Sequence, residues 1–122
     1  MSSWRASSID DIAADKWPYW APIRHHFGIS TFGINAWRGG AGDEVIKRHH
    51  ESESGHSELY FVLSGDALFT VGDEEVPGPA GTLLWVDDPA AERLAIATET
   101  NTVVLSISGP PLSGWDTAYL ES

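Results

Sequence analysis

Short runs of β-forming residues, separated at regular intervals by glycine-rich or acidic turns, fill this chain from residue 23 to residue 108. No long helical pattern interrupts them. About eight strands at this spacing in one short chain are typical of a β-sandwich or a closed β-barrel. The sequence predicts strands over Ile23–Phe27, Ser30–Arg38, Glu44–His49, Glu58–Leu63, Ala67–Val71, Thr82–Val86, Arg93–Thr98 and Thr102–Ser108.

The residues before this β-region follow a different pattern. Ser8, with Asp11 three residues later, is typical of a helix N-cap and predicts a short helix over Ile9 to Lys16. Pro18 and Pro22 then favour an extended, aromatic arm, because a proline restricts the residue before it to extended backbone. We expect a single domain made of the helix and arm (1–22), the β-barrel (23–109) and a C-terminal tail that packs on the barrel or on a partner (110–122).

The composition excludes several classes of function. The chain has no cysteine, which rules out disulfides, thiolate metal ligands and a cysteine nucleophile, and is compatible with a cytoplasmic protein. Its 18 acidic and 7 basic residues give a net charge of −11, which repels nucleic acid and anionic membranes. No apolar run approaches the roughly 20 residues that cross a bilayer. We therefore expect a small-molecule ligand or substrate, with no nucleic acid and no membrane as partner.

Two segments resemble the sequence motifs of the cupin superfamily. From Glu58 to Gly65 the chain has a glutamate, six residues and a glycine, as at the end of the first cupin motif. Pro79 and Gly81 form the proline–any residue–glycine core of the second motif. The resemblance covers residues 30 to 108 and implies an all-β cupin fold, a double-stranded β-helix (jelly-roll) barrel. On the strand pattern by itself, an immunoglobulin-like sandwich is the alternative.

The resemblance also implies a metal site, from which this sequence departs. Metal-binding cupins hold a divalent ion with two histidines and a glutamate from the first motif and a histidine from the second, where this chain has Leu84. His56 and Glu58, two residues apart, face the same way on a strand. His49, or alternatively His50, could complete a set that suits iron, manganese, zinc or nickel. The alternative is a solvated polar loop without a metal.

The barrel interior suggests two classes of function. Leu84 makes this interior more apolar, and an apolar pocket with few polar groups is typical of a ligand site. The sequence therefore favours a protein that binds a small, largely apolar molecule. The alternative is a cupin enzyme: a metal-dependent dioxygenase or isomerase, or a metal-free isomerase, cyclase or dehydratase with Glu58 and His56 as catalytic groups. The predicted pocket residues are Trp37, Tyr60, Phe69, Leu84 and Trp85.

Two further expectations concern the surface. Cupins pair through sheet edges, so we expect a homodimer, and the aromatic arm or the C-terminal tail could cross its interface. This leaves an interaction module as a third class of function. His25 and His26 are adjacent and would face opposite sides of a strand, so we expect them to have a structural or surface role.

Overall fold

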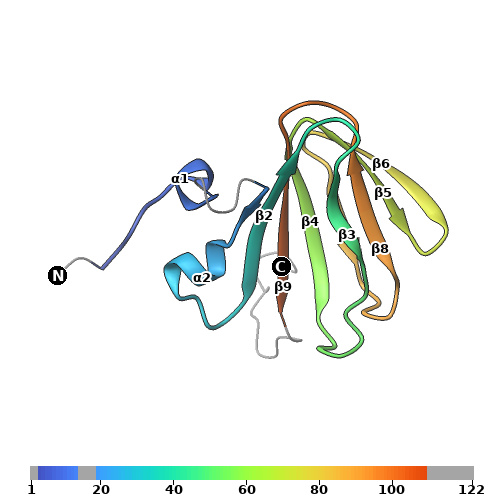
Figure 1. Ribbon diagram of the computed structural model, residues 1–122. Coiled ribbons are helices and arrows are strands. Elements are labelled where there is room, and N and C mark those ends of the chain that lie inside the picture. Colours follow the sequence, from blue (N-terminus) through green and yellow to red (C-terminus); the bar gives the residue numbers. More distant parts are fainter. Residues whose placement is uncertain (1–2, 14–18, 110–122) are drawn as a thin grey trace, which may run out of the picture.

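Two antiparallel sheets face each other in the computed structural model of this chain, which describes residues 3–13 and 19–109 (Figure 1). The five-stranded sheet has the order β1 (Trp20–Ala21), β2 (Gly33–Gly39), β9 (Thr102–Gly109), β4 (Ser57–Ser64) and β7 (Leu83–Val86). The four-stranded sheet has the order β3 (Glu44–His49), β8 (Arg93–Ala97), β5 (Asp66–Val71) and β6 (Glu74–Pro79). The predicted all-β jelly-roll fold is confirmed.

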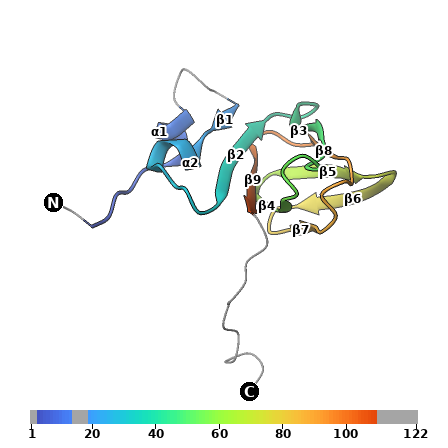
Figure 2. The same ribbon diagram turned by 90° about the horizontal axis from the view of Figure 1, so that it is seen from below.

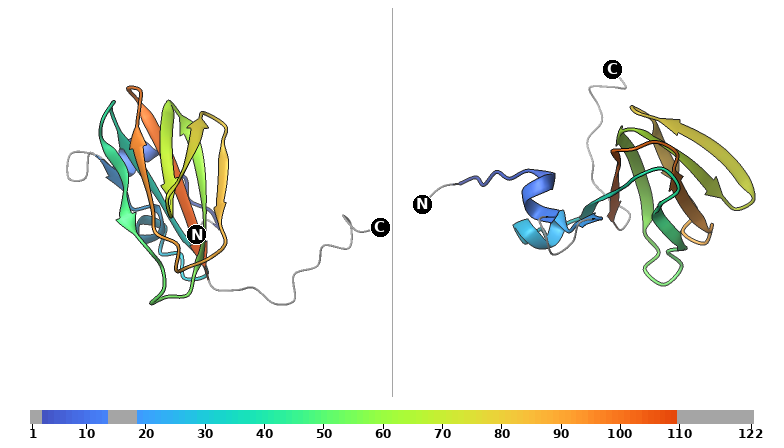
Figure 3. Two further views of the ribbon diagram at one scale, coloured as in Figure 1. Left: turned by 90° about the vertical axis from the view of Figure 1, so that its right-hand side faces the viewer. Right: turned by 45° about the horizontal axis from the view of Figure 1, so that its top comes forward.

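The hydrophobic core lies between the two sheets, whose layers are seen from the side in Figure 3. Alternate residues of each strand point inward, as the two-residue period of a strand requires. On β4, Glu58, Tyr60 and Val62 are buried, and β9 repeats the pattern with every second residue. The fully buried core includes Tyr60, Val62, Ala67, Phe69, Ala95 and Val104.

Two predicted elements differ from the structure. Ile23–Phe27 was predicted as a strand but forms the helix α2. This segment ends at Gly28, whose left-handed backbone (φ 68°) lets its N–H donate to the His25 carbonyl and close the helix. No strand was predicted between Val71 and Thr82, but Glu74–Pro79 forms the strand β6. Because β6 is an edge strand, a proline there can leave its missing N–H on the unpaired side.

The N-terminal helices α1 (Ile9–Ala13) and α2 lie outside the two sheets, next to the edge of the five-stranded sheet formed by β1 and β2 (Figure 2). The helix α1 begins as predicted, because the Ser8 hydroxyl accepts a hydrogen bond from the Asp11 N–H at 3.0 Å. β1 pairs with β2, and the rings of Trp20 and Trp37 stack with their centroids 5.8 Å apart. The predicted remainder of the helix and the C-terminal tail (110–122) lie outside the described residues.

The helices α1 and α2 are five residues each. Within residues 3–13 and 19–109, no helix has the length and apolar character needed to span a membrane.

Candidate functional site

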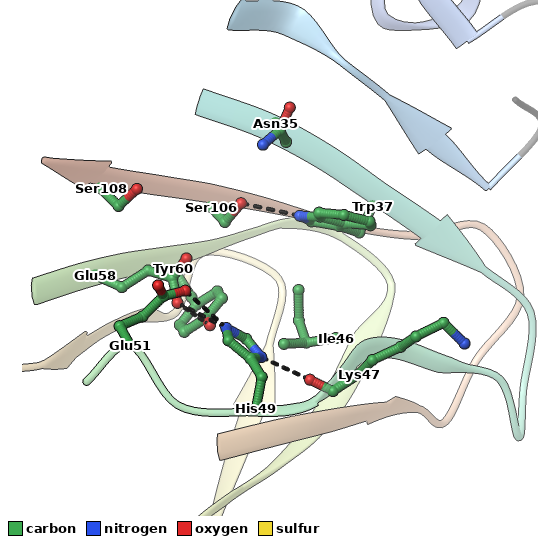
Figure 4. Close-up of a pocket in the computed structure, with 10 residues that line it drawn as sticks. All are labelled: Asn35, Trp37, Ile46, Lys47, His49, Glu51, Glu58, Tyr60, Ser106 and Ser108. Atoms are coloured by element: carbon green, nitrogen blue, oxygen red, sulfur yellow. Dashed lines mark hydrogen bonds and ion pairs between the residues drawn. The ribbon is translucent and has the colours of Figure 1, made fainter. Parts of the chain in front are cut away.

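A cavity of about 370 Å³ opens between the two sheets, with walls from both of them (Figure 4). Strands β2, β9 and β4 of one sheet and β3 of the other contribute inward-facing residues, and the loop after β3 adds one more. On β2, β4 and β9 the lining residues are two apart, so the strand period places them on one face. On β3 the adjacent residues Ile46 and Lys47 both line the cavity, where the pairing of β3 with β8 is irregular. The cavity is lined by Asn35, Trp37, Ile46, Lys47, His49, Glu51, Glu58, Tyr60, Ser106 and Ser108.

A buried ion pair forms the base of this site. Glu58 is 7% exposed and Arg93 is 1% exposed, and the Arg93 Nη1 lies 3.1 Å from the Glu58 Oε1. The Tyr60 hydroxyl donates to the same carboxylate oxygen. The rest of the guanidinium donates to two backbone carbonyls, of Ala91 at 2.9 Å and of Asp88 at 3.1 Å. Both buried charges are therefore paired and hydrogen-bonded, as burial of a charge requires.

His49 connects this ion pair to the cavity. Its Nδ1 lies 2.7 Å from the Lys47 carbonyl, and because a carbonyl only accepts, Nδ1 must carry a proton. Its Nε2 lies 3.2 Å from the Glu51 Oε1 and 3.4 Å from the Glu58 Oε1. His49 and Arg93 are also opposite each other in the β3–β8 register. Two cationic side chains of one sheet thus reach a carboxylate of the other.

These contacts shift the pKa values of three groups. Burial raises the pKa of Glu58, but hydrogen bonds from His49 and Tyr60 outweigh it and hold this pKa below its ordinary value of 4.5. The hydrogen bond to Glu58 raises the pKa of His49 above 6.5, against the effect of its partial burial. Burial, followed by the Glu58 charge, raises the pKa of Tyr60. The site therefore favours a charged His49–Glu58 pair beside a neutral tyrosine.

The shifts predict how stability depends on pH. The His49 contribution is fully present below pH 6.5 and is lost as the pH rises through its raised folded pKa. The Glu58 contribution is present above pH 4.5 and is lost as the pH falls through its lowered folded pKa. We expect the contribution of His49 and Glu58 to the free energy of unfolding to be largest between pH 4.5 and 6.5. Urea unfolding across a pH series measures it, and His49→Gln should remove the decline above pH 6.5. An unchanged decline in that variant would contradict the assignment.

The structure separates the predicted pocket residues into two groups. Trp37 and Tyr60 line the cavity. Phe69 is fully buried in the core with its ring centroid 5.7 Å from that of Tyr60, and Leu84 packs against the same core. Trp85 is 56% exposed. Among the described residues, these last three do not line the cavity.

The predicted ligand set is brought together only in part. Ligand atoms of His49, Glu51 and Glu58 lie within 4.8 Å of one another, so two of the three predicted residues are present and Glu51 joins them. His56 precedes β4 and is not among the described residues that line the cavity. The alternative, His50, is exposed, and its Nδ1 accepts from the Ser52 N–H at 3.2 Å.

The charges around this group decide how well it suits a metal. One imidazole and two carboxylates are ligands for divalent ions, and the Nδ1–carbonyl hydrogen bond of His49 leaves Nε2 for the ion. However, the Glu58 Oε1 already accepts hydrogen bonds from Tyr60 and Arg93. A metal ion bound to Glu58 would therefore lie near the positive charge of Arg93. Two unit charges of like sign about 4 Å apart repel by about 4 kcal/mol near a protein surface. The residues therefore fit a resident divalent metal poorly.

Sequence reasoning missed Arg93, Glu51 and the polar residues of β2 and β9. One signal for Arg93 was available: Ala95 and Ala97 follow it at two-residue intervals, and such small side chains leave room inside a barrel for a long one. Glu51 had no comparable signal, because it lies in a loop where no period fixes its direction.

Comparisons with known proteins agree with this architecture. No protein-family profile matches the sequence, and no curated protein matches it. Among solved structures, a cupin protein from Bacteroides fragilis is similar over 95% of this chain and 93% of its own, with a TM-score of 0.75 and 20% identity. An RmlC-like cupin from Desulfovibrio desulfuricans is 25% identical over 67% of this chain and 74% of its own, with a TM-score of 0.55.

A third similar structure carries a different description. A protein from Thermotoga maritima, described as a predicted oxalate decarboxylase, is 18% identical over 72% of this chain and 74% of its own, with a TM-score of 0.58. Similarity at this level of identity concerns the fold, and one fold can carry many activities. Together with the two motifs on β4–β5 and β6–β7, the comparisons establish that this chain has the cupin fold.

Proposed function

We propose that this chain binds a small organic molecule in the cavity between its sheets, without the help of a metal. The observation that carries this proposal concerns the hydrogen bonding of the Asn35 and Ser108 side chains. Both side chains line the cavity, and neither makes a hydrogen bond to any residue that the structure describes (Figure 4). Unused polar groups that converge on a cavity are typical of ligand recognition. Their amide and hydroxyl groups suit an oxygen-bearing ligand.

The remaining walls favour a ligand that also has an apolar, flat part. Trp37 is held in place, because its Nε1 donates to the Ser106 hydroxyl at 2.9 Å and its ring stacks on Trp20. Ile46 adds apolar surface on the opposite sheet. A rigid aromatic wall binds a flat ligand at little entropic cost. The volume, about 370 Å³, is at the small end of ligand sites.

The charge of the lining favours a neutral or singly anionic ligand. Lys47 and protonated His49 contribute two positive charges, Glu51 and Glu58 contribute two negative charges, and the buried Arg93 adds one positive charge behind them. This site is therefore not negative, although the whole chain has a net charge of −11. A cationic ligand would gain nothing from it.

Thermal unfolding in the presence of three probes tests this proposal: benzoate, benzyl alcohol and benzylamine. We expect an anionic or neutral probe to raise the melting temperature. The double variant Asn35→Leu/Ser108→Ala should weaken its binding by roughly 10- to 100-fold, because two hydrogen bonds are lost. Ser30→Ala, which alters an exposed residue outside the cavity, is the matched control. Stabilisation by benzylamine only, or an unchanged affinity in the double variant, would contradict the proposal.

A second candidate function is proton transfer to the bound molecule. It is favoured by His49, whose side chain is 35% exposed at the cavity and whose protonated form is stabilised by Glu51 and Glu58. In this function His49 is the general acid, beside Glu58, in the position that the sequence suggested for His56. Turnover of a bound probe that disappears in His49→Gln, while binding persists, would support it.

A further inference from the structure

We infer that Arg93 takes the electrostatic place of a metal ion in this barrel, so that the cation facing Glu58 is part of the chain. A carboxylate that is 7% exposed needs a counter-charge, and here the guanidinium provides it at 3.1 Å. The inference concerns the charge of the site and does not depend on which molecule the cavity binds.

The turn that precedes β8 is shaped to hold this guanidinium. The Ala91 N–H donates to the Asp88 carbonyl at 3.1 Å, which closes the turn. The Asp88 and Ala91 carbonyls also accept from the Arg93 Nη2 and Nε, so two edges of the planar group are fixed by backbone. Only Nη1 is left to point at Glu58. A guanidinium whose nitrogens are all hydrogen-bonded in this way stays charged and in one position, unlike a mobile cation on the surface.

The same contacts oppose a divalent ion at His49, Glu51 and Glu58. An ion bound there would share the Glu58 carboxylate with Arg93 and with the Tyr60 hydroxyl. It would also add two positive charges near a guanidinium that is 1% exposed and poorly screened by solvent. Removal of the Arg93 charge should therefore turn this group of ligands into a metal site.

Calorimetric titration of Zn²⁺ and Co²⁺ into five proteins at pH 7 tests the inference: the wild type, Glu58→Gln, Arg93→Met, Arg93→Met/Glu58→Gln and Arg48→Met. We expect Arg93→Met to bind one equivalent at least about tenfold more tightly than the wild type. Arg93→Met/Glu58→Gln should lose this gain. Arg48→Met is the matched control, because Arg48 is an exposed arginine paired with Glu92 and its loss changes the net charge equally. Its metal binding should equal that of the wild type.

The outcomes separate clearly. Tight binding of one equivalent to the wild type that is lost in Glu58→Gln would overturn the inference, as would an Arg93→Met affinity no greater than that of Arg48→Met. Arg93→Met could also fail to fold without a counter-charge for Glu58. In that case refolding with Zn²⁺ should restore the native circular dichroism spectrum and a cooperative melting transition, and a failure to restore them would overturn the inference.

Discussion

The Glu58→Ala variant is expected to lose about 3–5 kcal/mol of unfolding free energy, because it leaves a buried charge without its partner. Arg93 is 1% exposed and cannot reach solvent without opening the barrel. Its carbonyl acceptors at Ala91 and Asp88 would remain, but they do not neutralise its charge. A loss of this size is a large fraction of the stability of a typical small domain, which is about 5–15 kcal/mol.

Urea unfolding followed by tryptophan fluorescence measures this loss. Glu51→Ala is the matched control, since Glu51 also contacts His49 but its side chain is 27% exposed. This control should lose less than about 1 kcal/mol. The double variant Glu58→Leu/Arg93→Met removes both charges and should recover most of the stability. Equal losses in Glu58→Ala and Glu51→Ala would show that burial of the pair is not the cause.

The second large effect is expected for Gly65→Ala, at the turn between β4 and β5. Gly65 has a left-handed backbone (φ 73°), which costs about 1–2 kcal/mol for any residue with a Cβ. An added Cβ would also lie 2.3 Å from the Thr102 Oγ1 and 2.6 Å from its Cα. Thr102 cannot move aside easily, because it is fully buried and its hydroxyl bonds to the Glu99 carbonyl. Overpacking adds about 1–3 kcal/mol, so we expect a loss of roughly 2–5 kcal/mol.

Gly72→Ala separates the two causes of this loss. Gly72 has a similar backbone (φ 62°), but nothing lies within 4 Å of the position of its added Cβ. The unfolding free energy of Gly72→Ala should fall only by the cost of the left-handed conformation, about 1–2 kcal/mol. The comparison is made by urea unfolding of both variants. Equal losses of unfolding free energy would mean that Thr102 moves aside without cost and that its closeness to Gly65 does not exclude a side chain there.

The sequence predicts most of the fold because turn chemistry and strand period agree along the barrel. β3 was predicted with its observed bounds, Glu44–His49, and β5 and β9 to within one residue at either end. The prediction of a strand over Ile23–Phe27 was wrong, because five residues are too few to distinguish a helical period from that of a strand. Its end at Gly28 is the local feature that indicates a helix.

The site was harder to predict because apolar residues also occupy the outer faces of the sheets. On β8, Leu94 and the 40% exposed Ile96 point away from the core, while Arg93 points inward. On β9, Ser106 is buried between outward-facing neighbours, Leu105 and Ile107. A pattern that places the larger apolar residues inside therefore assigns these polar residues to the wrong face. His49 and Glu58 were recoverable because the motif resemblance fixed the direction of Glu58.

The position of the buried ion pair has a consequence for the order in which the barrel assembles. Glu58 belongs to the five-stranded sheet and Arg93 to the four-stranded sheet. Before the sheets meet, each charge keeps its hydration shell, so the pair contributes nothing to early folding. We expect the pair to form when water leaves the interface between the sheets, after the main barrier to folding has been crossed. Such a late contact mainly slows unfolding, and the pair therefore lengthens the lifetime of the closed barrel rather than speeding its formation.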